Sequence, residues 1–215
     1  MFLCADLCLW NISFFYTTLA ESNLLANLVP FVVALYMWLL FRERPDRRLL
    51  LPSLVAISGL LMLTMANGAL HINHLIGNVL ALATAFFYAA FLLVTKSLRE
   101  RHSALKVMTI LGVWCGVGCL FVSAIARENA TPETLRGWSI LLGLAVSSQL
   151  LGQTLMAHCV KYISIQLASL FILLQPVAAA LYSYILFDEI LTATQVLGVC
   201  ALLAAIYRSR EIMES

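Results

Sequence analysis

Two stretches of the chain, LLANLVPFVVALYMWLLFRE from Leu24 to Glu43 and LFILLQPVAAALYSYILFDE from Leu170 to Glu189, are versions of one sequence. They lie 146 positions apart and align without a gap, so that a proline near the middle and a glutamate at the end coincide. Each stretch has the roughly 20 mostly apolar residues that a helix needs to cross a bilayer. A duplicated membrane-spanning unit is typical of secondary transporters, whose solute site lies where the repeats meet.

The composition indicates that lipid is the solvent for most of the chain. Hydrophobic residues make up 62% of the 215 positions and charged residues 11%, and the mean hydropathy is +0.95. A soluble domain of this length cannot bury so much apolar surface. The net charge of +2 is too small to suggest a nucleic-acid partner, so the expected partners are the lipid bilayer and a small-molecule solute.

Apolar runs predict an all-α multi-pass membrane protein with eight transmembrane helices. Helices are favoured over a barrel because the runs are continuously apolar and do not alternate with polar residues. The expected spans are 2–19, 22–42, 49–67, 74–95, 104–126, 137–159, 163–187 and 191–207.

The basic residues predict the orientation of these spans. Eleven of the 13 Lys and Arg residues fall on one side of the predicted topology, and that side is cytoplasmic by the positive-inside rule. Both termini are then cytoplasmic, in the plasma (inner) membrane if the source is bacterial. Glu43 and Glu189 fall on opposite sides, so the two copies of the repeat are expected to be inverted, which would give one scaffold two equivalent states, open inward and open outward.

Three motifs carry a resemblance to a known family. They are Ala26-Asn27-Leu28-Val29-Pro30, its counterpart Leu174-Gln175-Pro176, and Gly77-Asn78-Val79-Leu80-Ala81-Leu82. Their order and duplication resemble EamA-type members of the drug/metabolite transporter superfamily. The resemblance implies ten spans in two five-span halves around a central cavity, and it implies export of a small organic solute.

Compared with the ten-span plan of this family, the chain lacks counterparts of the family's first two spans. Residues 1–68 are expected to form an incomplete first repeat of three spans, and residues 73–208 a complete second repeat of five. A fragment, a late start and a reduced protein all fit this pattern. A shortened transporter could also pair with a second copy as a homodimer.

Polar and aromatic side chains inside the predicted spans are the candidates for the walls of a solute cavity. Amides within a bilayer must face protein or water, and they could hydrogen-bond an uncharged or zwitterionic solute. Hydrogen bonding between helices is the competing interpretation. The candidates are Asn27, Gln149, Gln153, Gln175, Trp10 and Tyr88.

Two prolines and two glutamates recur at equivalent positions of the repeat. Pro30 and Pro176 are expected within helices, where each removes one backbone hydrogen bond and could act as a hinge or as a fixed kink. Glu43 and Glu189 end the two copies, and each is expected to cap the helix that follows.

Asp6 and His158 are the candidates for coupling transport to protons. Asp6 lies inside a predicted span, where carboxylates are costly and often functional. His158 lies near the cytoplasmic end of another span and could titrate near neutral pH. Either residue could equally lie at the membrane interface without a role in transport.

The six cysteines show no disulfide framework. Cys4 and Cys8, like Cys115 and Cys119, are spaced by one helical turn, and neither pair has a histidine or carboxylate on the same helical face at a suitable spacing. They are therefore expected to be small packing residues, with no metal site and no cofactor.

Secondary transport is the function that these features favour. There is no GxxxxGK[ST] loop, so ATP is not the expected energy source. An intramembrane protease is disfavoured because the sequence lacks HExxH and GxSxG motifs and a second carboxylate inside a span, so no enzyme activity is expected. A non-transporting membrane protein or assembly partner is the alternative.

The inverted repeat makes a direct prediction about topology. A reporter tag inserted just after Arg44 and one inserted just after Glu189 should lie in different compartments, because the two copies cross the bilayer in opposite directions. Protease protection or impermeant labelling of each tag in intact cells measures this. Both tags in one compartment would contradict the inverted repeat.

Overall fold

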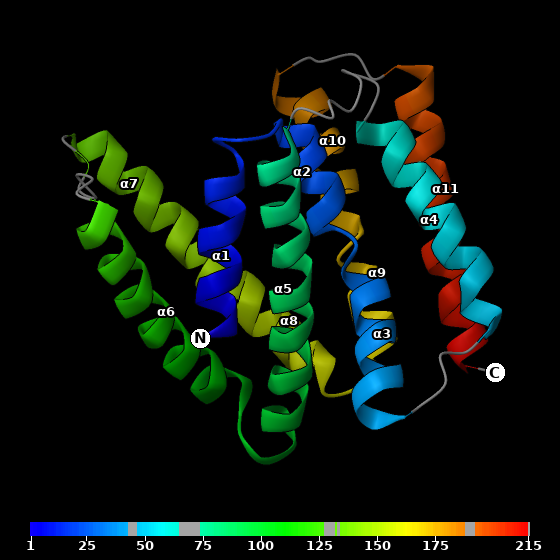
Figure 1. Ribbon diagram of the computed structural model, residues 1–215, viewed down its shortest axis with the longest axis horizontal. Coiled ribbons are helices and arrows are strands. Elements are labelled where there is room, and N and C mark those ends of the chain that lie inside the picture. Colours follow the sequence, from blue (N-terminus) through cyan, green and yellow to red (C-terminus); the bar gives the residue numbers. More distant parts are fainter. Residues whose placement is uncertain (43–46, 65–73, 127–131, 133, 188–191, 215) are drawn as a thin grey trace.

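The computed structural model describes residues 1–42, 47–64, 74–126, 132, 134–187 and 192–214, and every regular element in those ranges is a helix (Figure 1). Five helical segments are long and apolar enough to cross a membrane. These are Glu21–Phe41, Leu75–Arg101, Ala104–Ile125, Leu135–Val160 and Ile165–Tyr182. The predicted all-α, multi-pass membrane architecture is confirmed at this level.

The predicted number of eight spans is not confirmed. The segment predicted as 2–19 forms helix α1, which ends at Ser13 after 12 residues. At 1.5 Å per residue such a helix covers about 18 Å, against about 30 Å for the bilayer core. Helix α4, Leu50–Thr64, is also short. Helix α11, Ala193–Glu214, is polar from Arg208 onward and is not among the five segments.

Both copies of the repeat are broken helices, whereas the sequence predicted two continuous spans with a central kink. The chain is non-helical at Asn27 and Leu28 and again at Ile172 and Leu173. The helices on either side are α2 (Leu19–Ala26) and α3 (Val29–Phe41), and α9 (Ile165–Phe171) and α10 (Leu174–Phe187).

Each proline therefore lies in the first turn of the second helix of its pair, as Pro30 does in α3 and Pro176 in α10. A missing amide hydrogen costs nothing there, because the first amides of a helix have no partner within it. In Figure 1 the chain descends through α2 and α3 and ascends through α9 and α10.

Helix α5, Leu75–Arg101, is the centre of the packing and contacts α1, α2, α3, α8 and α9. Its neighbour α6, Ala104–Ala126, lies at the edge beside a long bent segment. That segment consists of α7 (Leu135–Leu144), the π-helix η4 (Ala145–Gly152) and α8 (Gln153–Val160). Three apolar clusters hold these elements together, and α5 contributes to two of them.

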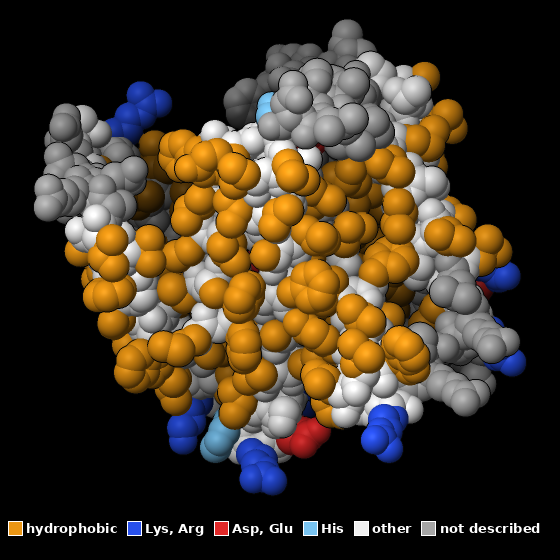
Figure 2. Space-filling view, in the orientation of Figure 1, with side chains coloured by type: hydrophobic (Ala, Val, Ile, Leu, Met, Phe, Trp, Pro, Cys, Tyr) orange, Lys and Arg blue, Asp and Glu red, His pale blue; other side chains and the backbone are white. Residues whose placement is uncertain are grey.

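Basic side chains near the end of α5 donate hydrogen bonds to carbonyl groups in α8 and just after it. Arg99 is buried, and its Nε donates to the carbonyl of Ala157 at 2.9 Å. Lys96 donates to the carbonyl of Ile163 at 2.8 Å. Cations suit the carbonyl end of a helix, as at the end of α8. Figure 2 shows an apolar belt with most of the visible Lys and Arg side chains at its lower margin and lower right.

Helices α4 and α11 touch through their backbones at two glycines. A methyl group on Gly59 would lie 2.8 Å from the carbonyl oxygen of Gly198, and one on Gly198 would lie 2.6 Å from that of Gly59. Only glycine permits this approach, which is a common way for helices to associate in lipid.

The close contact predicts that Gly198→Leu destabilises the protein. A side chain there must displace the backbone of α4, so the loss should reach the upper end of the roughly 1–3 kcal/mol typical of overpacking. Thermal unfolding in detergent measures it. Gly112→Leu is the matched control, because a side chain at Gly112 meets nothing within 4 Å. Equal stability of the two variants would contradict the packing.

Candidate functional site

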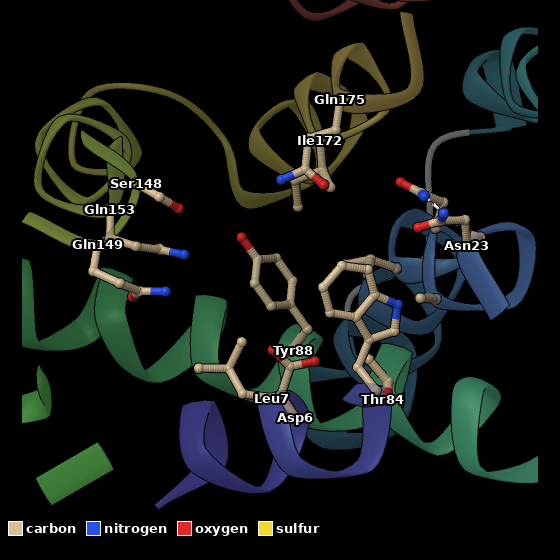
Figure 3. Close-up of a pocket in the computed structure, with 14 residues that line it drawn as sticks. Asp6, Leu7, Asn23, Thr84, Tyr88, Ser148, Gln149, Gln153, Ile172 and Gln175 are labelled. Carbon is tan, nitrogen blue, oxygen red and sulfur yellow. Dashed lines mark hydrogen bonds between the residues drawn. The ribbon is translucent and has the colours of Figure 1, made fainter. Parts of the chain in front are cut away.

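A cavity of about 340 Å³ lies among α1, the two broken helices, α5 and η4 (Figure 3). This volume is within the range of small-molecule sites, roughly 300–1,000 Å³. Its walls combine amides, hydroxyls, one carboxyl group and apolar side chains. They are Asp6, Leu7, Trp10, Asn23, Ala26, Asn27, Val29, Thr84, Tyr88, Ser148, Gln149, Gln153, Ile172 and Gln175.

Helices α1 and α5 supply one side of the cavity through residues one helical turn apart. Asp6 and Trp10 share one face of α1, and Thr84 and Tyr88 share one face of α5. Asp6 is only 5% exposed and lies next to Tyr88, whose hydroxyl group points into the cavity (Figure 3). The carboxyl group of Asp6 therefore lies beside the aromatic ring of Tyr88 in the cavity wall.

The opposite side comes from the π-helix. The backbone amide of Gln153 donates to the carbonyl of Ser148, five residues earlier, so the turn is wider than in an α-helix. Ser148 and Gln149 of this segment line the cavity, together with Gln153, the first residue of α8. Such π-turns are frequent at functional sites because they re-aim side chains within a helix.

The two helix breaks supply the remaining walls. Asn23 and Asn27 come from the first break, where the Nδ2 of Asn27 donates to the carbonyl of Asn23 at 2.8 Å. Gln175 comes from the second break. Lacking an amide hydrogen, the prolines cannot donate to the carbonyls four residues earlier, those of Ala26 and Ile172. Both of these residues line the cavity.

Three polar atoms of the cavity residues are buried without a hydrogen-bond partner within the described chain. They are the Nε1 of Trp10, the Oδ1 of Asn27 and the Oε1 of Gln153. An unpaired buried polar atom costs about 1–3 kcal/mol. One donor and two acceptors thus remain free to bind a solute or water.

The cavity is open on the side of η4 and α10. Gln149 and Gln175 both line it and are both exposed. Their amides approach from different elements, with Gln149 on the η4 side and Gln175 on the α9–α10 side in Figure 3. A polar opening of this kind cannot face hydrocarbon without cost, so water or protein must cover it.

The structure brings all six predicted cavity residues together, and Asp6 with them. It places His158 elsewhere, exposed near the end of α8 with its ring 5.3 Å from that of Tyr162. Glu43 and Glu189 lie outside the described residues. The roles of all these residues in transport remain predictions.

Some cavity residues were missed that a periodicity argument could have found. Asn23 precedes Asn27 by one helical turn, and Thr84 precedes Tyr88 by the same distance. The apolar members Leu7, Val29 and Ile172 carry no signal in the sequence.

A second buried carboxyl group, Glu21, lies in the first turn of α2. Residue 21 falls between the predicted spans 2–19 and 22–42. Its Oε2 is 2.5 Å from the hydroxyl of Thr17 and 3.3 Å from the Nδ1 of His74. Because Thr17 also contacts Asn78 at 2.7 Å, this cluster ties the α1–α2 turn to the start of α5.

The comparison with known proteins decides the family. Residues 75–209, more than half of the chain, match the EamA-like transporter family. The chain belongs to that family. The resemblance inferred from the repeat and its flanking motifs is confirmed, and transport across a membrane is the common activity of the relatives.

Two relatives illustrate the relationship of this EamA-like chain to curated proteins. The uncharacterized transporter YetK of Bacillus subtilis is 25% identical over 202 residues, covering 89% of this chain and 60% of YetK. The pseudopaline exporter CntI of Pseudomonas aeruginosa is 26% identical over 208 residues, covering 94% and 71%. The chain thus spans about 60% of the length of YetK.

The fold is also that of a solved crystal structure. The two superpose with a TM-score of 0.82 over 99% of this chain and 74% of the other. Their sequences are 13% identical, so this likeness supports the fold alone.

The exposed amides of Gln149 and Gln175 at the opening of the cavity predict that water reaches it. In a variant without native cysteines, Gln149→Cys should react with a charged methanethiosulfonate on the order of tenfold faster than Leu120→Cys, because the reactive thiolate forms in water and not in hydrocarbon. Leu120 is the control because it is exposed on α6. Equal modification rates in reconstituted vesicles would contradict a hydrated cavity.

Proposed function

We propose that the protein is a secondary transporter that exports a small organic solute by alternating access, with the cavity as its solute site. The observation that carries the proposal is the convergence of polar groups from five elements on one cavity, three of whose polar atoms lack a partner. A membrane protein gains nothing structurally from such atoms, so a ligand or water is their natural partner.

The side chains favour an uncharged or zwitterionic solute. Amide groups of Asn27, Gln149 and Gln153 offer both donors and acceptors. Among the described residues no Lys or Arg lines the cavity, so none of them would compensate a phosphate or a polyanion. Asp6 could pair with the ammonium group of a zwitterion, or it could exchange a proton with the cavity and couple transport to a proton gradient.

The repeat supports alternating access. Three pairs of cavity residues are separated by the same 146 positions that relate the two stretches, namely Leu7 with Gln153, Ala26 with Ile172, and Val29 with Gln175. Together with the opposite directions of the two broken helices in Figure 1, these pairs support a cavity on the axis of an inverted repeat. Such a repeat offers two equivalent arrangements, open to either side.

The helix breaks give each repeat a place to bend. Pro30 lies two residues and Pro176 three residues beyond the two non-helical points. The helical hydrogen bonds are interrupted at each break and neither proline can donate across it, which lowers the cost of changing the angle there. We therefore propose both breaks as hinges of the transport cycle. Residues 1–68 and 73–208 would be the two repeats that move against each other.

The relatives support export, and CntI is named an exporter of pseudopaline. That solute is not carried over, because the identity is 26%. In the proposed topology both termini face the cytoplasm, in the plasma (inner) membrane of a bacterial cell. A homodimer is compatible with this arrangement.

The transport assay uses reconstituted full-length chain and a panel of zwitterionic amino acids and uncharged drug-like amines. We expect flux of at least one panel member above that of empty liposomes. Gln153→Leu keeps the side-chain volume but removes the amide, so it should lower this flux about tenfold, as expected from the loss of one solute hydrogen bond of about 1.4 kcal/mol.

Leu120→Ala, on the outer surface of α6, is the matched control and should transport like the unchanged protein. Unaltered flux in Gln153→Leu would show that the solute does not pass through the cavity. Absence of flux for every panel member would favour the alternative, a non-transporting membrane protein or assembly partner.

A further inference from the structure

Four of the six cysteines meet between α1 and α6, on the side of α1 away from the solute cavity. The Sγ atoms of Cys4, Cys115 and Cys119 all lie within 4.8 Å of one another. The thiol of Cys8 interacts with those of Cys4 and Cys119. Each helix contributes a pair spaced by one turn, so two i,i+4 pairs face each other across the helix–helix contact.

The backbone of α6 leaves room for this cluster. A methyl group at Gly118 would overlap the Sγ of Cys4, so a glycine at this position lets the thiol of α1 approach α6. All four cysteines are free thiols and only partly exposed. The other two, Cys159 and Cys200, are exposed and stand apart.

We propose that Cys4, Cys115 and Cys119, with Cys8 as a fourth donor, form a binding site for a thiophilic d¹⁰ metal ion such as Zn²⁺ or Cd²⁺. An all-sulfur donor set selects soft ions and disfavours Mg²⁺, Ca²⁺ and Mn²⁺, which prefer oxygen. With metal–sulfur bonds of about 2.3 Å, ligand sulfurs lie about 4 Å apart. Rotating the cysteine side chains so that their sulfur atoms move by less than about 1 Å would bring the three sulfurs to that spacing.

The ion compensates most of the charge of its ligands. Each cysteine that binds the ion releases its proton to solvent, so one sulfur–metal bond forms for each sulfur–hydrogen bond that breaks. Three thiolates around a divalent ion carry one net negative charge in place of three. Pairing with the ion therefore lowers the cost of holding thiolates in an apolar place.

The site is separate from the solute cavity. At 100° per residue, Cys4 and Cys8 lie on one face of α1, Asp6 and Trp10 lie on roughly the opposite face, and Leu7 lies between the two. Metal binding would therefore tie α1 to α6 without entering the cavity. The inference does not depend on the proposed transport function.

No metal site is expected from the sequence, because neither pair of cysteines has a histidine or carboxylate partner at a suitable spacing along the chain. Neither pair of cysteines contains enough donors by itself. The four thiols form a site only when α1 packs on α6, a contact that the spacing within each helix does not reveal.

The test titrates the purified full chain in detergent with Cd²⁺ and follows the ultraviolet thiolate-to-cadmium absorption. We expect saturation at one Cd²⁺ per chain. In the Cys115→Ser/Cys119→Ser variant the affinity should fall by more than the roughly 10–100-fold that loss of an outer-shell contact alone causes. The Cys159→Ser/Cys200→Ser variant is the matched control and should bind like the unchanged protein.

In a second measurement, the unchanged protein is labelled with N-ethylmaleimide in its native state. Intact mass analysis then counts the modified cysteines. Cd²⁺ should reduce the count, and a chelator should restore it. If the Cys115→Ser/Cys119→Ser variant aggregates on size exclusion, Cys4→Ser/Cys8→Ser replaces it, because it removes the donors of α1.

Three results would overturn the proposal. They are the lack of a saturable absorption, equal Cd²⁺ affinity in the cluster and control variants, and protection from labelling that dithiothreitol reverses but a chelator does not. The last result would identify a disulfide between the two helices in place of a metal site.

Discussion

Hydrocarbon offers no hydrogen-bond partner to a polar group, and the architecture of this protein follows from that constraint. Amides, hydroxyls and interrupted backbone inside the bilayer must turn toward protein or water. The two helix breaks, the π-helix and the amides of Asn27, Gln149, Gln153 and Gln175 accordingly meet at one cavity. The apolar belt of Figure 2 covers the visible outer face.

The same constraint explains how much could be predicted from the sequence. Apolar runs gave the helical class, because their length and continuity reflect the bilayer directly. Four amides and two aromatic residues inside those runs identified six cavity residues, since polar groups there have few permitted directions. The repeat identified the elements that carry them. Leu7, Val29 and Ile172 were missed because an apolar wall residue looks like any other apolar residue.

Other features depend on contacts between elements and left no usable signal. The spans 22–42 and 163–187 were expected to be continuous, but each is broken a few residues before its proline, and three of the four residues at the two breaks are apolar like their neighbours. The early end of α1 at Ser13 was hidden by the apolar residues that follow. The π-helix depends on one extra residue in a turn, and the meeting of the Cys4, Cys115 and Cys119 thiols depends on the packing of α1 on α6.

The backbone contact between Gly59 and Gly198 has a mechanical consequence. Two helices whose main chains touch cannot slide along each other without a collision, and the apolar cluster around Leu60 and Leu202 locks the same pair on either side. Helices α4 and α11 therefore behave as one stiff strut at an end of the molecule (Figure 1). Any rearrangement that exposes the cavity to one aqueous phase and then the other must pivot against this strut, leaving its internal geometry unchanged.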